Sequence, residues 1–187
     1  MNFKLLITGI ISIAVLLTAG IVASDEGWKE RGKASWKKSR LDVAPVTNTL
    51  YAEECGDCHF AYQPGLLPAR SWNSIMDTLE DHFGESAELE KGDGKAVRRY
   101  LLTNSADDSD YKRSRKILAS LDSNDAPRRI TSVRYFRRKH HELPEDIVRR
   151  DKELSSMSNC PACHRRAETG SYEEDEISIP GIGRWED

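Results

Sequence analysis

Two pentapeptides in this chain have the residue types and the spacing that can anchor a porphyrin covalently. Residues 55–59 read CGDCH and residues 160–164 read CPACH, so both follow the pattern C-x-x-C-H and together they use all four cysteines. Two thiols three positions apart on one helical turn can both reach the vinyl groups on one edge of a porphyrin, and the histidine that follows then lies under the iron. We therefore predict two covalent c-type haems, attached at Cys55, Cys58, Cys160 and Cys163, with His59 and His164 as the first ligands of the two irons.

Other chemistry of paired cysteines fits this chain less well. A four-cysteine zinc site usually has its two pairs about 15–20 residues apart, whereas residues 59–159 separate the pairs here. A thioredoxin-like dithiol resembles CPAC, but that motif belongs in a strand–helix–strand surround, and no alternation typical of strands flanks either motif. A disulfide would explain neither histidine. Two haem sites make electron transfer the leading function.

The N-terminal residues predict export from the cytoplasm. An apolar run at residues 5–22 follows Lys4 and ends in small residues, which is typical of a secretory signal. We predict that residues 1–24 are a signal peptide. The run has about 18 residues, close to the length that spans a bilayer, so an uncleaved membrane anchor is the alternative. Either way the rest of the chain is expected in the periplasm, because bacterial c-type haem is attached outside the cytoplasm.

Charge is spread unevenly along the chain, although the totals nearly balance at 28 Lys and Arg against 31 Asp and Glu. Residues 112–152 are rich in Lys and Arg, whereas residues 77–90 and the tail from Glu173 are acidic. A basic stretch can indicate nucleic-acid binding, but export argues against nucleic acid as a partner. Solvated helix faces explain the stretch, and so does a docking face for an acidic redox partner.

The pattern of apolar residues predicts a mainly α fold with two small haem-binding lobes. We expect a linker at 25–45, a first haem lobe at 46–122, and a second haem lobe with a C-terminal tail at 123–187. Ser71 is a suitable N-cap for a helix whose apolar residues recur at helical spacing up to Gly84. Further helices are predicted from near Thr47 into the first motif and over 86–101, 111–121, 131–141 and, in part, 145–157.

The first iron needs a second ligand, unless it binds a gas or a substrate. His82 falls on the apolar face of the helix predicted to start at Ser71, where an imidazole needs a partner. Met76 is its rival, but a methionine on such a face is expected to pack in the core. We therefore predict that His82 completes the first iron site.

The second iron has two adjacent candidates, His140 and His141. Neighbouring side chains on a helix point about 100° apart, so only one of them should bind, and the residues alone do not choose. Met157 lies three residues before Cys160 and cannot reach the opposite face of that haem.

Several stretches of the chain resemble the family of bacterial dihaem cytochromes c. They are YAEECGDCHFAYQPGLLPARSW at 51–72, DHFG at 81–84, RIT at 129–131, RRKH at 137–140 and NCPACHRRA at 159–167. The similarity extends over about residues 45–172, and the first stretch is far more specific than C-x-x-C-H alone. The resemblance implies two covalent haems, each with two histidine ligands, in a two-lobed fold whose first lobe is similar to class I cytochromes c. By the same resemblance, the second ligands are His82 and His140.

Two residues or segments near the first motif are expected to support its haem. A carbonyl of the loop 64–68 is the expected acceptor for the second ring nitrogen of His59, since ligating imidazoles usually donate that proton to a carbonyl or carboxylate. Arg70 is a candidate partner of a haem propionate, or an ordinary surface arginine.

These features predict an exported carrier of single electrons without catalytic residues. Its donor is expected in the membrane, a b-type cytochrome being one candidate, and its acceptor is expected to be a soluble exported haem protein. The alternatives are a dihaem enzyme, such as a peroxidase or a small-molecule reductase, and a gas-binding haem protein. Both alternatives need an open or labile iron, and the chain has enough histidines to close both irons.

Overall fold

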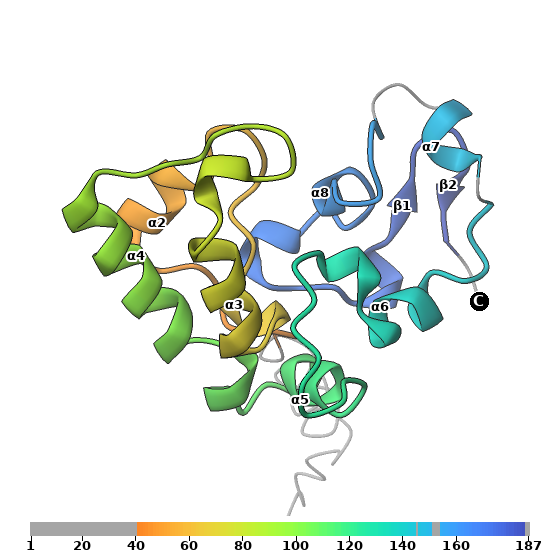
Figure 1. The fold of residues 1–187 in the computed structure, drawn as a ribbon. Coiled ribbons are helices and arrows are strands. Elements are labelled where there is room, and N and C mark those ends of the chain that lie inside the picture. The colour runs from red at the N-terminus through yellow and green to blue at the C-terminus, as the bar shows by residue number, and fades with distance from the viewer. Residues whose placement is uncertain (1–40, 145, 151–153, 186–187) are drawn as a thin grey trace, which may run out of the picture. The chain divides into compact units, whose positions relative to one another are not determined.

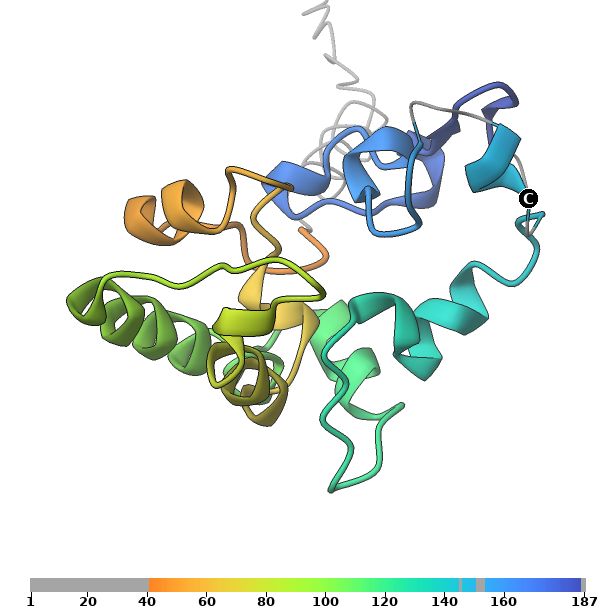
Figure 2. The ribbon, with the colours of Figure 1, turned by 45° about the horizontal axis from the view of Figure 1, so that its top comes forward.

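Short helices joined by turns make up most of the part of the chain that the computed structural model describes, residues 41–144, 146–150 and 154–185 (Figures 1 and 2). These residues belong to one compact unit, and the prediction of a mainly α fold is confirmed. The predicted signal peptide and the linker up to residue 40 lie outside the described residues, and the predicted lobe boundary at 123 stays a prediction. Within the described ranges, no helix combines the length and the apolar character that crossing a membrane requires.

The helices and strands of the described residues are short. The α-helices are α2 (Thr49–Glu54), α3 (Ala69–Met76), α4 (Lys91–Thr103), α5 (Lys112–Leu118), α6 (Arg134–Lys139), α7 (Ile147–Arg150) and α8 (Cys160–Cys163). Single 3₁₀ turns lie at Pro64–Leu66, Leu79–Asp81, Ala106–Asp108, Ile130–Ser132, Ala167–Thr169 and Glu174–Glu176. Two strands, β1 (Ser178–Ile179) and β2 (Gly183–Arg184), pair antiparallel as a hairpin.

Helices α2, α3 and α4 pack together and support the first motif (Figure 1). Trp72 and Ile75 of α3 share one buried apolar cluster with Val97 and Leu101 of α4. The indole Nε1–H of Trp72 donates to the carbonyl oxygen of Pro64 (2.7 Å). This bond ties α3 to the loop that follows the first C-x-x-C-H motif.

The start of α3 differs from the prediction. The helix begins at Ala69, directly after Pro68, whose fixed φ suits a helix start. Ser71, the predicted N-cap, lies inside the helix and is fully buried. The predicted cap is therefore wrong, because Pro68, three residues before Ser71, is already the N-cap of the helix.

The end of α3 also differs from the prediction. The last helical residue is Met76, and the hydroxyl of Thr78 donates to the carbonyl oxygen of Ser74 (3.0 Å), which closes the helix end. The prediction of one helix over 71–83 is wrong, and His82 does not lie on a helix.

Helix α4 begins later than its sequence predicts. The predicted start at residue 86 is wrong, since the helix starts at Lys91. The N–H of Ala87 donates instead to the carbonyl oxygen of Leu79 (2.8 Å), so residues near 87 are held against the preceding turn rather than in a helix.

Helices α5, α6, α7 and α8 and the β1–β2 hairpin make up the rest of the unit (Figures 1 and 2). Helices α7 and α8 and the hairpin contribute to a second apolar cluster, whose buried members are Ile147, Leu154 and Ile179. Ile179 belongs to β1, so the tail is packed into the fold. The sequence predicts no strand in this tail, because two-residue strands are too short to show alternation.

The segment before α2 is held against the residues that follow α8 and against α5. The backbone N–H groups of Asp42 and Val43 donate to the carbonyl oxygen of Gly170 (2.9 and 3.2 Å). The carboxylate of Asp42 accepts the N–H of Tyr172 (2.7 Å) and pairs with Arg113 (2.9 Å). Val43 is fully buried, so the last residues of the predicted linker are part of the core.

Candidate haem sites

Site 1 is the group formed by Cys55, Cys58, His59 and His82, and it starts where α2 ends. The side chain of Asn48 caps this helix by accepting the N–H of Tyr51 (2.8 Å), and Cys55 is its C-cap. The chain then turns so tightly that a Cβ at Gly56 would collide with the carbonyl oxygen of Ala52. Glycine is therefore required at this position of the motif for the cysteines to be presented as they are.

The imidazole of His59 is held by its own neighbour. Its Nδ1–H donates to the carbonyl oxygen of Phe60 (2.9 Å), which leaves Nε2 available to a metal. The predicted acceptor, a carbonyl of loop 64–68, is wrong, since the loop carbonyl that faces a side chain, that of Pro64, accepts from Trp72.

His82 lies in a tight turn that follows the Leu79–Asp81 3₁₀ segment. Its N–H donates to the carbonyl oxygen of Glu85 (2.7 Å). The two central residues, Phe83 and Gly84, have φ values of 62° and 104°, as a type I′ turn requires. The turn rather than a helix face therefore positions His82.

The two histidines of site 1 lie opposite each other. The ring centroids of His59 and His82 are 6.2 Å apart. A metal holds an imidazole nitrogen at about 2 Å, so two imidazoles on opposite sides of one metal have their centroids about 6 Å apart. The separation in site 1 meets that requirement.

Site 2 is the group formed by His140, Cys160, Cys163 and His164, and it is built by α8 and the end of α6. Helix α8 spans CPAC, with Pro161 in its first turn, where no backbone donor is needed. His140 is the C-cap of α6. Its Nδ1–H donates to the carbonyl oxygen of Phe136 (2.8 Å), and its ring stacks on the Phe136 ring at 3.8 Å. The ring centroids of His140 and His164 are 6.1 Å apart, so these histidines meet the same requirement as those of site 1.

His141 is placed differently from its neighbour. Its side chain is 68% exposed, its Nδ1–H donates to the carbonyl oxygen of Arg138 (2.9 Å), and its Nε2 lies 3.7 Å from the Glu142 carboxylate. Of the two adjacent candidates, the structure places His140 opposite His164.

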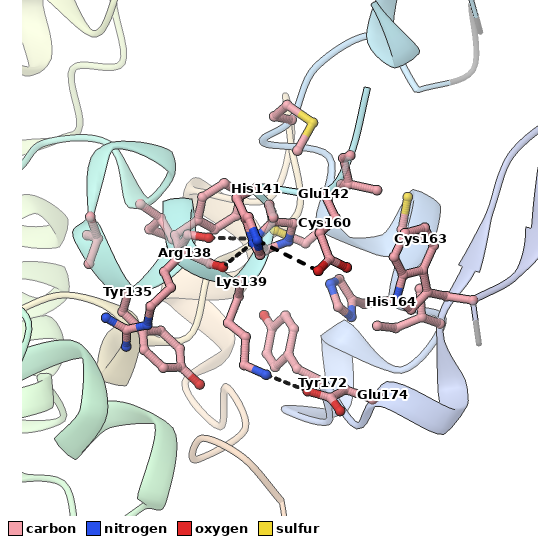
Figure 3. A pocket seen from close by; sticks show the side chains of 18 of the residues that line it. Tyr135, Arg138, Lys139, His141, Glu142, Cys160, Cys163, His164, Tyr172 and Glu174 are labelled. Carbon is pink, nitrogen blue, oxygen red and sulfur yellow. Dashed lines mark hydrogen bonds and ion pairs between the residues drawn. The ribbon is translucent and has the colours of Figure 1, made fainter. Parts of the chain in front are cut away.

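A cavity of about 600 Å³ lies at site 2 (Figure 3). Such a volume is within the usual range of cofactor sites, about 300–1,000 Å³. Its walls are mostly apolar and include Ile177, Ile179 and Trp185 of the tail. Lys139 and Glu174 also line it and form an ion pair of 2.6 Å. The residues present therefore fit a large, mostly apolar group that has charged side chains beside it.

Burial keeps the histidines of site 2 neutral. Burial, with a smaller contribution from the nearby His140, lowers the pKa of His164 to about 4. Burial also lowers the pKa of His140 and, at site 1, that of His82. Because neutral imidazole is the form that binds a metal, these rings are suited to ligation at ordinary pH.

The cysteine alternatives find no support in the geometry. No disulfide joins the four cysteines. Among the described residues, no three His, Cys, Asp or Glu side chains come together as a site for a bare metal ion. The arrangement at both motifs is that of two thiols and two opposed imidazoles.

Comparison with known proteins identifies the family. The family model for dihaem cytochrome c matches residues 51–172. The chain belongs to the dihaem cytochrome c family. It is similar to the crystal structure of a dihaem cytochrome c from Shewanella baltica, with 37% identity over 74% of this chain and 98% of that one, at a TM-score of 0.62. It is also similar to a dihaem cytochrome c from Rhodobacter sphaeroides, with 40% identity over 70% of this chain and 100% of that one, at a TM-score of 0.62. No curated protein matches the chain.

Membership of the dihaem cytochrome c family gives the two motifs their cofactor. The chain carries two covalently bound c-type haems, for which Cys55 and Cys58, and Cys160 and Cys163, are present. The family implies electron transfer. The mostly apolar cavity at site 2 and the opposed imidazoles at both sites fit this cofactor.

Arg70 contacts the turn that follows α5. Its guanidinium donates to the backbone carbonyl oxygens of Asp122 and Asp125. It therefore holds this turn against α3, and its pairing with a haem propionate stays a prediction.

Two tyrosines for which the sequence predicts no role contact the motif histidines. The ring centroid of Tyr62 is 5.0 Å from that of His59, and the ring centroid of Tyr172 is 5.2 Å from that of His164. Burial raises the pKa of Tyr62 to about 12 and raises the pKa of Tyr172 as well, so both phenols stay protonated. Their place in the sequence could have pointed to them, since both tyrosines lie within the range of about 45–172 that resembles the family.

Proposed function

We propose that the chain carries single electrons, with His59 and His82 as the ligands of one iron and His140 and His164 as those of the other. The observation that supports this most is the pair of imidazole separations, 6.2 and 6.1 Å. A haem with two imidazole ligands supplies a one-electron couple in which neither ligands nor protons have to be exchanged.

The proposed ligand set favours a carrier over an enzyme or a gas-binding protein. An enzyme or a gas carrier needs an open position on one iron, and here two imidazoles face each other at both sites. The stacking and the hydrogen bond of His140 with Phe136 hold that ring in place. Met76 is buried in the apolar cluster of α3 and α4, as expected for a core residue. Since a methionine ligand raises haem potential, two imidazoles at each iron should give lower potentials than a Met/His cytochrome.

We propose a membrane-bound donor, a b-type cytochrome being one candidate, and a soluble exported haem protein as the acceptor. The proposed compartment is the periplasm, with the chain either soluble or held by its N-terminal segment. The signal-like residues 1–24 support this placement.

Three single variants of the holoprotein test the ligand set. His82→Ala and His140→Ala should each convert one of the two haems from six-coordinate low-spin to high-spin, seen in absorption and in electron paramagnetic resonance (EPR) spectra. His141→Ala is the matched control for His140→Ala and should leave both haems low-spin. Unchanged spectra in both His82→Ala and His140→Ala would overturn the proposal.

Carbon monoxide separates the carrier from its rivals. The reduced wild-type protein should bind carbon monoxide slowly or not at all, because both irons have two protein ligands. Rapid binding at one haem would favour the enzyme or gas-binding alternative.

A further inference from the structure

The two tyrosines beside the motif histidines form hydrogen bonds that cross between the sites. Tyr62 contacts His59 of site 1, yet its hydroxyl donates to the carbonyl oxygen of Ser158 (2.7 Å), two residues before the first cysteine of site 2. Tyr172 contacts His164 of site 2, yet its hydroxyl donates to the side-chain oxygen of Gln63 (2.7 Å), the neighbour of Tyr62. Each tyrosine therefore packs on one site and bonds to the other.

Gln63 is the buried centre of this arrangement. Its side chain has an exposed fraction of 0%. Its amide oxygen accepts from Tyr172, and its amide nitrogen donates to the carbonyl oxygen of Ala167 (2.6 Å), three residues after His164. A buried amide is tolerated only when such partners are present, so the position of Gln63 is fixed by the second motif although it follows the first.

The result is a continuous chain of contacts between the two motif imidazoles. One branch runs from the His59 ring to the Tyr62 ring, along the backbone to Gln63, across a hydrogen bond to Tyr172, and on to the His164 ring. A second branch leaves the Tyr62 ring through its hydroxyl, crosses the hydrogen bond to Ser158 and follows the backbone to Cys160. The backbone between Tyr62 and Gln63 is itself held, because the hydroxyl of Tyr51 donates to the backbone carbonyl oxygen of Tyr62 (2.6 Å). The cross-bonds thus lie in a well-packed region rather than on a loose surface.

We propose that Tyr62, Gln63 and Tyr172 form a bridge that couples the two haem sites and carries electron exchange between them. In that exchange one iron is oxidised from ferrous to ferric and the other is reduced from ferric to ferrous, while the phenolic protons stay on their oxygens. The three residues are positioning residues, since none of them binds iron. The proposal rests on the proposed ligand set, because the bridge ends on His59 and His164.

Conservative variants of the holoprotein test the bridge. Tyr62→Phe and Tyr172→Phe keep both rings in contact with the histidines and remove only the cross-bonds. After injection of one electron by a photoexcited reductant, the redistribution of that electron between the haems should slow several-fold in each variant. Tyr100→Phe is the matched control, because the Tyr100 hydroxyl accepts the N–H of Thr47 and makes no cross-bond between the sites; its rate should match wild type.

A second measurement separates coupling from damage to the ligands. The EPR spectra and the midpoint potentials of Tyr62→Phe and Tyr172→Phe should equal those of wild type. Tyr172→Leu, which also removes the ring, should shift the EPR signal of the site 2 haem, because the His164 ring then loses a packing surface.

Two results would overturn the bridge. One is a wild-type redistribution rate in both phenylalanine variants, as expected if electrons pass directly between the haem edges. The other is a slower rate that appears only together with changed spectra or potentials, which indicates a structural role. Failure of the ligand assignment is recognised separately, because the wild-type spectrum would then lack two low-spin haems with two imidazoles each.

Discussion

The β1–β2 hairpin gives a sharp test of how site 2 is kept closed. Ile179 is 3% exposed, and Ile182, three residues later in the hairpin turn, is 56% exposed. Replacing either one by alanine removes the same atoms from the same hairpin. At the buried position the change should cost about 2–5 kcal/mol, whereas at the exposed position it should stay within about 0.5 kcal/mol.

The stabilisation lost in Ile179→Ala should first increase opening of the hairpin itself. The ion pairs of this tail, Lys139 with Glu174 and Arg166 with Glu176, are largely exposed and contribute about 1 kcal/mol each at most. A loss of about 3 kcal/mol raises the population of the opened hairpin roughly 100-fold, since 1.4 kcal/mol corresponds to a factor of ten.

Native-state amide hydrogen exchange measures this opening. The N–H of Trp185 donates to the carbonyl oxygen of Ile177 (3.3 Å), so its exchange reports whether the hairpin is closed. In Ile179→Ala this exchange should quicken by about two orders of magnitude, and the potential of the site 2 haem should fall because solvent exposure helps to set it. Equal exchange in Ile179→Ala and Ile182→Ala would refute the reasoning.

Three further predictions follow from the packing and the ring geometry. The imidazole planes are 32° apart at site 1 and 74° apart at site 2, so the oxidised protein should show one rhombic low-spin EPR signal and one of much larger g anisotropy; two identical signals would contradict this. Trp72→Phe leaves the carbonyl of Pro64 without its indole donor and should lower the free energy of unfolding in urea by about 1–3 kcal/mol; an unchanged urea midpoint would count against it. Gly170→Ala should destabilise more than Gly183→Ala in the same assay, because both have positive φ but only the former Cβ would meet the carbonyl oxygen of Val43, at 2.5 Å; equal losses would show that the backbone yields.

The covalent chemistry of the chain could be predicted from the sequence because it depends on local spacing. Two thiols and a histidine within five residues define a haem attachment whatever the surrounding fold. The mainly helical class follows from apolar spacing in the same way. These predictions use only residues that are close together along the chain.

The position of His82 shows where local reasoning failed. Helical spacing continues past Met76 through Leu79 and Phe83, and it predicts one long helix. In the structure the Thr78 hydroxyl closes the helix end, and a turn follows at Phe83 and Gly84. Neither feature can be recognised from the spacing of the apolar residues. The same histidine stands within the DHFG stretch that resembles the family, so the resemblance succeeded where periodicity failed.

Contacts between distant segments could not be predicted at all. Tyr62 and Ser158 are 96 residues apart, and Tyr172 and Gln63 are 109 apart. Their pairing depends on how two motifs are brought together, and no local pattern contains that information.

The two cysteines of the second motif have different surroundings, and this bears on how the protein matures. Cys160 packs against the apolar cluster of α3 and α4, and Cys163 packs against the cluster of Ile147, Leu154 and Ile179. A porphyrin bonded to both sulfurs would therefore be held by residues of both clusters. An assembly enzyme needs access to both sulfurs, so we expect this motif to be loaded before the two clusters have packed together.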